Sequence, residues 1–252
     1  MNLDLDAITL DKGAHDRPDD GMCVMEAVAM LAGEEWSDAP SCASPVIATF
    51  LRSWNDVLPD DERQSLKRYI PLLVGTAASA EVEDRRAWMC LDWLVRVNAP
   101  AWLRLAGLTE QADRLAGLPE FVAGMDVPAI RPTIEAVRAD ARAAGAAAWA
   151  AARAAAGDAA GDAAWDAAGA AAWDAARDAA RDAAGAAAWA AAWAAAGAAA
   201  WAAVEAAAEA AGAAARAAGD AARDALRPTV VELQESAHGL VDRMLAVTEH
   251  AR

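Results

Sequence analysis

The stretch from Gly145 to Ala225 constrains the fold of this chain more than any other part of the sequence. Alanine fills most of its positions, and in steps of four from Gly145 the first residue of each tetrad is Trp, Gly, Arg or Glu for most of the length. Alanine is the best helix former and is depleted in strands. The tract therefore predicts helix. Because no alternating β-pattern occurs elsewhere, we expect an all-α fold.

The tryptophans of this low-complexity tract share one register with its glycines. They are Trp149, Trp165, Trp173, Trp189, Trp193 and Trp201. A large ring from one helix can pack over a glycine of its neighbour, while the alanines let the two backbones approach closely. This tryptophan stripe is our candidate binding surface. The alternative interpretation is that any helix-favouring tetrad would serve and that the marked residue is free to vary.

The period of the tract argues against one long rod. Four residues exceed the about 3.6 of a helical turn, so the stripe advances roughly 40° per repeat and would demand a strong right-handed supercoil. One straight helix would also span about 120 Å, whereas a compact chain of this size has a radius of gyration of about 18 Å. We therefore expect long helices folded back as hairpins. Gly157-Asp158, Gly161-Asp162 and Gly219-Asp220 each place a helix-ending glycine before a capping aspartate, as a turn requires.

Three regions follow from composition. Residues 1–127 predict an N-terminal helical domain, residues 128–226 the tetrad-repeat region, and residues 227–252 an amphipathic helix that opens at Pro228 and packs on the N-terminal domain. The apolar set of that last helix is Val230, Leu233, Ala237, Leu240, Val241, Met244 and Val247.

Capping and breaker residues predict the N-terminal helices. We expect helices over Met22–Leu31, capped by Asp19 or Asp20; over Pro45–Val57, capped by Ser44; over Asp60–Tyr69, ended by Pro71; and over Ala80–Val97, ended by Asn98 and Pro100. The alternative for the third helix is that Leu72–Ala78 extend it after a kink. In the last of these, Trp88, Leu91, Leu94 and Val95 are expected to face the core, and Arg86 to face water.

Charge limits the classes of partner. The net charge of -16 disfavours binding to nucleic acid or anionic lipid. Residues 183–204 carry no charge and are long enough to cross a bilayer, but alanine and glycine supply little hydrophobic drive, so we do not expect a membrane span. The start MNLDLDAITL lacks the basic and apolar regions of a signal peptide. We therefore expect a cytoplasmic protein. Three irregularly spaced cysteines predict reduced thiols and no disulfide framework.

The densest polar group comprises His15, Cys23, Glu26, Asp38, Cys42 and Ser44. Four of these, His15, Cys23, Glu26 and Cys42, form our candidate metal or thiol site. Cys23 lies near a predicted helix start, where the helix dipole lowers a thiol pKa, and His15 could act as its base. Alternatively, Cys, His and carboxylate side chains could bind a metal ion. The structural interpretation is that the cysteines pack as small apolar residues and His15 caps a turn. This third interpretation is the most common outcome for such residues, and we expect no cofactor.

Several sequence words carry a resemblance. The segment GAHDRPDDGMCVMEAVAMLAGEEWSDAPSCASPVIATF from Gly13, followed by RSWND, YIPLLVGT and AWLRLAGL, resembles a family of uncharacterised bacterial and phage proteins. Members share this N-terminal region and end in an alanine and aromatic tetrad repeat of variable length. The tail also resembles that of immunity proteins in composition. The resemblance implies the architecture predicted above and implies no activity.

Three functions fit the sequence. The first is a non-enzymatic helical interaction or scaffold protein that uses its Ala/Trp arm to bind a protein partner or to self-associate. The second is an acidic inhibitor or immunity-type protein that blocks a basic site on a toxin or a nucleic-acid enzyme. The third is a small metal-dependent or cysteine-dependent enzyme that uses the group of His15, Cys23 and Cys42.

Overall fold

The computed structural model describes residues 4–5, 7–123, 125–126, 128–148, 150–151, 216–217 and 219–249. These residues form helices, turns and loops and no strand, which confirms the all-α prediction. The six tract tryptophans and the predicted turns at Gly157-Asp158 and Gly161-Asp162 lie outside the described residues. In the described part of the chain, no helix is long and apolar enough to cross a membrane.

The chain divides into two compact units, residues 1–134 with 231–252 (unit 1) and residues 135–230 (unit 2). The labelled elements of unit 1 are η1 (Pro18–Asp20), α1 (Val24–Ala32), α2 (Pro45–Val57), α3 (Asp60–Arg63), η2 (Gln64–Tyr69), α4 (Ile70–Leu73), α5 (Ala80–Trp93), the π-helical turn η3 (Leu94–Asn98), α6 (Ala99–Leu105) and α7 (Thr109–Ala116). Two further helices cover residues 128–148 and 219–246, and each runs from one unit into the other.

Local capping signals predicted the start and the cap of α2 correctly. For α1 they predicted a helix but misplaced its start and its cap. Helix α2 begins at Pro45 behind Ser44, whose hydroxyl accepts a hydrogen bond from the Ile47 amide, as predicted. Helix α1 begins two residues later than expected, and its cap is Cys23. The prediction of Asp19 or Asp20 as the cap is wrong, because both belong to the separate turn η1.

Proline signals misplaced three helix ends. Pro71 does not end a helix, because it occupies the first turn of α4, where its missing amide costs nothing. Pro100 likewise lies in the first turn of α6, and the π-helical turn η3 connects α5 to α6 without a break. Pro228 does not open the final helix, since residues 219–246 are continuously helical. Gly219 and Asp220 belong to the same helix, so the turn predicted there is also wrong.

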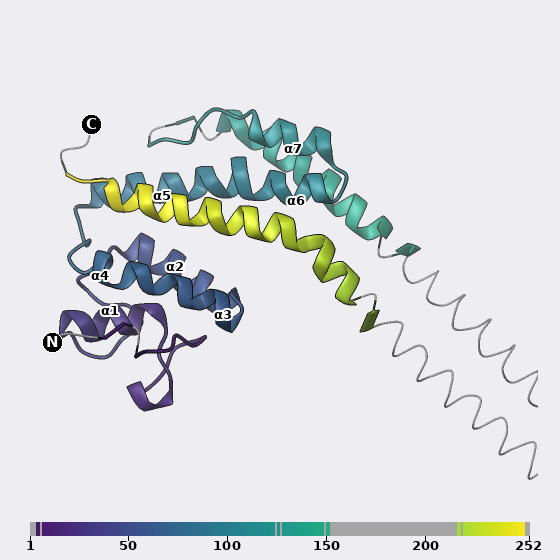
Figure 1. The fold of residues 1–252 in the computed structure, drawn as a ribbon. Coiled ribbons are helices and arrows are strands. Elements are labelled where there is room, and N and C mark those ends of the chain that lie inside the picture. Colours follow the sequence, from purple (N-terminus) through teal and green to yellow (C-terminus); the bar gives the residue numbers. More distant parts are fainter. Residues whose placement is uncertain are drawn as a thin grey trace, which may run out of the picture. The chain divides into compact units, whose positions relative to one another are not determined.

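The final helix completes the core of unit 1. Its buried residues belong to the same apolar cluster as α1, α2, η2, α4 and α5, and they are Leu233, Ala237, Leu240, Val241 and Met244. All five come from the apolar set predicted for this helix. Figure 1 shows the C-terminal part of this helix, in yellow, lying alongside α5. The Trp93 indole donates a hydrogen bond to the Ser236 hydroxyl across this contact, at 2.8 Å.

The predicted inner face of α5 is wrong in its most important residue. Leu91 and Leu94 are 39% and 48% exposed, whereas Arg86 is only 3% exposed. The Arg86 guanidinium donates to the carbonyl oxygens of Met244 at 3.1 Å, Val247 at 3.2 Å and Thr76 at 2.8 Å. Arginine is buried here because the final helix ends beside it, and the carbonyl oxygens of Met244 and Val247 at that end accept hydrogen bonds from the guanidinium.

A carboxylate balances this buried charge. Glu83, one turn before Arg86 on α5, accepts from the guanidinium at 2.7 Å. Its other oxygen accepts from the hydroxyl of Ser44, the cap of α2, at 2.5 Å. Ser44, Glu83 and Arg86 therefore connect the start of α2, helix α5 and the end of the final helix.

We expect Arg86→Met to destabilise the protein by about 3 kcal/mol, because it leaves Glu83 and three carbonyl oxygens without their buried partner. Urea unfolding followed by circular dichroism measures this change. The control is Arg104→Met, which removes an exposed ion pair with Asp113 and should cost less than about 1 kcal/mol. Equal losses in the two variants would contradict the role assigned to Arg86.

Candidate functional site

The start of α1 brings three of the four predicted site residues together. Cys23 is the N-cap, and its sulfur accepts a hydrogen bond from the Glu26 amide at 3.5 Å. The Glu26 carboxylate returns to accept from the Cys23 amide at 2.7 Å. This reciprocal pair is a capping box in which cysteine stands where serine or threonine is usual. His15 joins it through Nδ1, 2.8 Å from Glu26 Oε2.

Glu26 is the centre of this group and is 1% exposed. Besides the Cys23 amide and the His15 ring, it accepts from the His15 amide at 2.6 Å. Burial by itself raises the pKa of this carboxyl, but the hydrogen bonds from the Cys23 and His15 amides and from the His15 ring outweigh it. The pKa of Glu26 therefore lies below its usual value of 4.5. The carboxylate is held ionised and fully engaged.

The environment of Cys23 is opposite to that of a nucleophile. Burial, and after it the charge of Glu26, raise the pKa of this thiol to about 12, against the lowering effect of the backbone amides. The expectation that the helix start would favour a thiolate is therefore wrong, because desolvation and the neighbouring carboxylate exceed the helix dipole. Cys23 is 2% exposed, so its sulfur is also closed to solvent.

His15 is held in place by a hydrogen bond from Trp36 and by close packing of its ring on Gly21. Its backbone oxygen accepts from the Trp36 indole at 2.7 Å. Its ring lies so close to Gly21 that a Cβ atom at that position would come within 2.5 Å of Nε2. Gly21 has a φ of 132°, in a region that side chains rarely adopt. The loop from residue 15 to 21 therefore positions the ring against Glu26.

The fourth predicted residue, Cys42, has separate partners. Its backbone oxygen accepts from the amides of Gly75 at 3.0 Å and Ala77 at 3.1 Å. Burial, and after it the Glu34 carboxylate, raise the pKa of the Cys42 thiol. Within the described ranges, no group of three or more His, Cys, Asp or Glu residues has an arrangement that could hold a metal ion.

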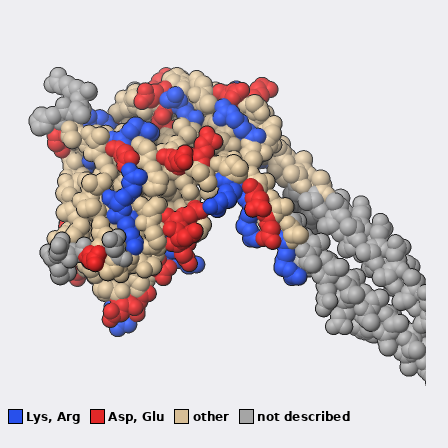
Figure 2. Space-filling model, in the orientation of Figure 1, with Lys and Arg blue, Asp and Glu red and all other residues tan. Residues whose placement is uncertain are grey.

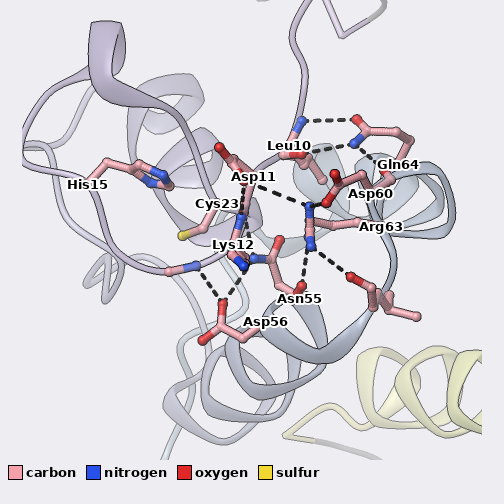
Figure 3. A network of polar contacts seen from close by, with 12 residues as sticks. Leu10, Asp11, Lys12, His15, Cys23, Asn55, Asp56, Asp60, Arg63 and Gln64 are labelled. Carbon is pink, nitrogen blue, oxygen red and sulfur yellow. Dashed lines mark hydrogen bonds and ion pairs between the residues drawn. The ribbon is translucent and has the colours of Figure 1, made fainter. Parts of the chain in front are cut away.

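A second polar network lies next to this group and was not found from the sequence (Figure 3). The side chain of Asn55, fully buried in α2, accepts from the Val24 amide at 3.3 Å and donates to the Asp11 carbonyl at 2.8 Å. Arg63 is 2% exposed and donates to the carbonyls of Asn55 at 2.8 Å and Leu58 at 2.7 Å. These bonds join the N-terminal segment and α1 to α2, and they join α3 to the end of α2.

The same network borders an open pocket of about 600 Å³. Its lining residues are Ile8, Thr9, Leu10, Asp11, Gly21, Asp60, Asp61, Arg63, Gln64 and Lys67. Arg63 is committed to Asp60 at 2.7 Å, and the Gln64 amide pairs with both backbone groups of Leu10 at 2.9 Å. The buried polar groups around the pocket thus bind the chain itself.

Taken together, the polar atoms of the predicted site serve as helix caps and loop ties. A sequence signal for this existed in the spacing of Cys23 and Glu26, which matches a capping box. The chain showed no significant similarity to protein-family models, to curated proteins or to solved structures.

We expect Cys23 to stay unmodified when the native protein is treated with a thiol reagent at pH 8, because its thiol is buried and its pKa is about 12. Mass spectrometry of tryptic peptides identifies the modified residue. The urea-unfolded protein, in which Cys23 should react readily, is the control. Rapid modification of native Cys23 would restore the nucleophile hypothesis.

We expect Glu26→Gln to cost about 2 kcal/mol, because an amide replaces an ionised acceptor of three hydrogen bonds. The folded pKa of Glu26 is depressed, so its contribution is complete above about pH 4.5 and is lost as the pH falls through the folded pKa. The wild type should therefore lose more stability than the variant below that pH. Unfolding midpoints from pH 7 to 3 measure this, with Glu110→Gln on the surface of α7 as control. Parallel curves for wild type and Glu26→Gln would contradict the assignment.

Proposed function

We propose that this protein is a non-enzymatic helical interaction protein, and that its alanine and tryptophan tract binds a protein partner or a second copy of the chain. The observation that carries the proposal is how the tract is bounded. The helix before it includes Ile130, 7% exposed, and the helix after it includes Leu233, 6% exposed. Both residues belong to unit 1, so the tract begins and ends on helices that are anchored there.

The chemistry of the N-terminal group supports the same proposal. The polar side-chain atoms of His15, Cys23 and Glu26 are hydrogen-bonded to one another and to backbone amides. A thiol with a pKa of about 12 is protonated at neutral pH and is a poor nucleophile. Their role in stabilising the start of α1 accounts for this arrangement, and no chemical reaction is needed to explain it.

Tryptophan is the residue type best suited to the proposed surface. It is enriched in the centres of protein interfaces, where a buried ring contributes a large share of the binding energy. The competing proposal, an acidic inhibitor, relies on the net charge of -16. On the face shown in Figure 2, however, acidic and basic side chains are interspersed. That face therefore lacks the single-sign surface that a basic site would recognise.

The test replaces all six tract tryptophans with alanine in the full-length chain. Alanine preserves helix propensity, so we expect unchanged helix content by circular dichroism, together with loss of self-association in sedimentation velocity or of partner capture. The control is Trp102→Ala, which removes a tryptophan of α6 that is 37% exposed. Unchanged association in the six-site variant would refute the proposal. Capture of a basic partner that depends on salt and not on tryptophan would favour the acidic inhibitor instead.

A further inference from the structure

His238 lies where the final helix meets η2 and α2, and sequence reasoning did not select it. Its ring stacks on Tyr69 of η2, with centroids 5.6 Å apart, and meets Trp54 of α2 edge-on at 4.7 Å. Nδ1 lies 2.7 Å from the Tyr69 hydroxyl, which is also 3.3 Å from the His238 carbonyl oxygen. The imidazole is therefore enclosed by two aromatic rings and joined to one of them by a hydrogen bond.

The charged groups around this ring are few. On η2, Arg68 lies over the Tyr69 ring, 5.1 Å from its centroid, and pairs at 3.2 Å with Asp242, one turn after His238 on the final helix. Glu62 of α3 is hydrogen-bonded to Gln234, one turn before His238. Helix α2 contributes the uncharged Trp54 ring. A positive charge on His238 would therefore lie beside the positive charge of Arg68. The carboxylate nearest to Arg68 is already paired with that guanidinium.

We propose that His238 is a proton-sensitive latch, through which mild acid loosens the docking of the final helix on η2 and α2. We assign the neutral ring the tautomer that carries its hydrogen on Nε2, so that Nδ1 accepts a hydrogen bond from the Tyr69 hydroxyl. Protonation places a hydrogen on Nδ1, so Tyr69 must turn its own hydrogen toward the His238 carbonyl at the longer distance of 3.3 Å. The same step puts a positive charge between two aromatic rings and next to Arg68.

The direction of the pH effect follows from the folded-state pKa. Burial, and after it Arg68, lower the pKa of His238 below its usual 6.5, although Asp242 acts in the opposite direction. Between these two pKa values the undocked helix binds a proton that the docked helix does not. Docking is therefore strongest above about pH 6.5 and weakens as the pH falls to the folded pKa. Burial also raises the pKa of Tyr69 to about 12, which keeps its hydroxyl protonated throughout this range.

The consequence concerns the whole final helix. Residues 231–246 belong to unit 1, and the same helix continues back to residue 219 in unit 2. Acid that loosens residues 231–246 would release the C-terminal anchor of the tract from the core of unit 1. The inference concerns the docking of this helix and holds whether or not the tract binds a partner.

The first measurement is an NMR titration of the imidazole signals of the full-length chain, which contains only His15, His238 and His250. His238→Asn assigns its signal by loss. We expect the His238 pKa to lie below that of the same residue in the urea-unfolded protein. A His238 pKa equal to or above the unfolded value would overturn the proposal, and this result does not depend on the folding of any variant.

The second measurement is hydrogen exchange of peptides covering residues 233–244 at pH 7.5 and 5.5, corrected for intrinsic exchange rates. We expect opening of the wild type to increase at pH 5.5, by up to about tenfold for each unit by which the His238 pKa is lowered. Asparagine keeps a hydrogen-bonding group near the place of Nδ1 but does not titrate, so His238→Asn should lose this increase. The control His250→Asn should retain it. The same increase in wild type and His238→Asn would overturn the proposal.

Discussion

The buried guanidinium of Arg86 is the interaction on which the arrangement of unit 1 depends. It donates to carbonyl oxygens of Thr76, Met244 and Val247 and to the carboxylate of Glu83. Removing a charge from water is costly unless nearly all its donors find acceptors. Two of those acceptors, the carbonyl oxygens of Met244 and Val247, are available only when the end of the final helix lies against α5. The side chain is therefore stable in its position only in the folded arrangement, and it favours that arrangement over alternative dockings.

The residues that look most like a catalytic group likewise satisfy polar groups of the backbone, at the start of α1. Cys23 and Glu26 satisfy each other's backbone amides at the start of α1, and His15 adds two donors to the same carboxylate. The first amides of a helix have no partner within it, so capping residues supply one. The need to cap the first amides of α1 is therefore enough to explain why a cysteine, a histidine and a glutamate lie together.

The final helix makes two polar contacts of different kinds. The Arg86 guanidinium donates to the carbonyl oxygens at the end of the helix, whereas the neutral ring of His238 is sensitive to mild acid. The two contacts lie about two turns apart on one helix, between His238 and the carbonyl of Met244. Apolar burial of Leu240 and Val241 between them supplies the background attraction. A helix docked by both contacts can remain in place while the free energy of its docking on the core varies with pH.

The sequence by itself determined the fold class, the start of α2 and the buried face of the final helix. Alanine content, the Ser44-Pro45 pair and the spacing from Leu233 to Met244 are local signals, and helices obey local signals. Only the tertiary structure decided that Arg86, Arg63 and Asn55 are buried and that Pro228 lies within a helix. Sequence patterns assign charged and amide side chains to water. Their burial here depends on carbonyl groups supplied by segments distant in the chain, and no local pattern records those partners.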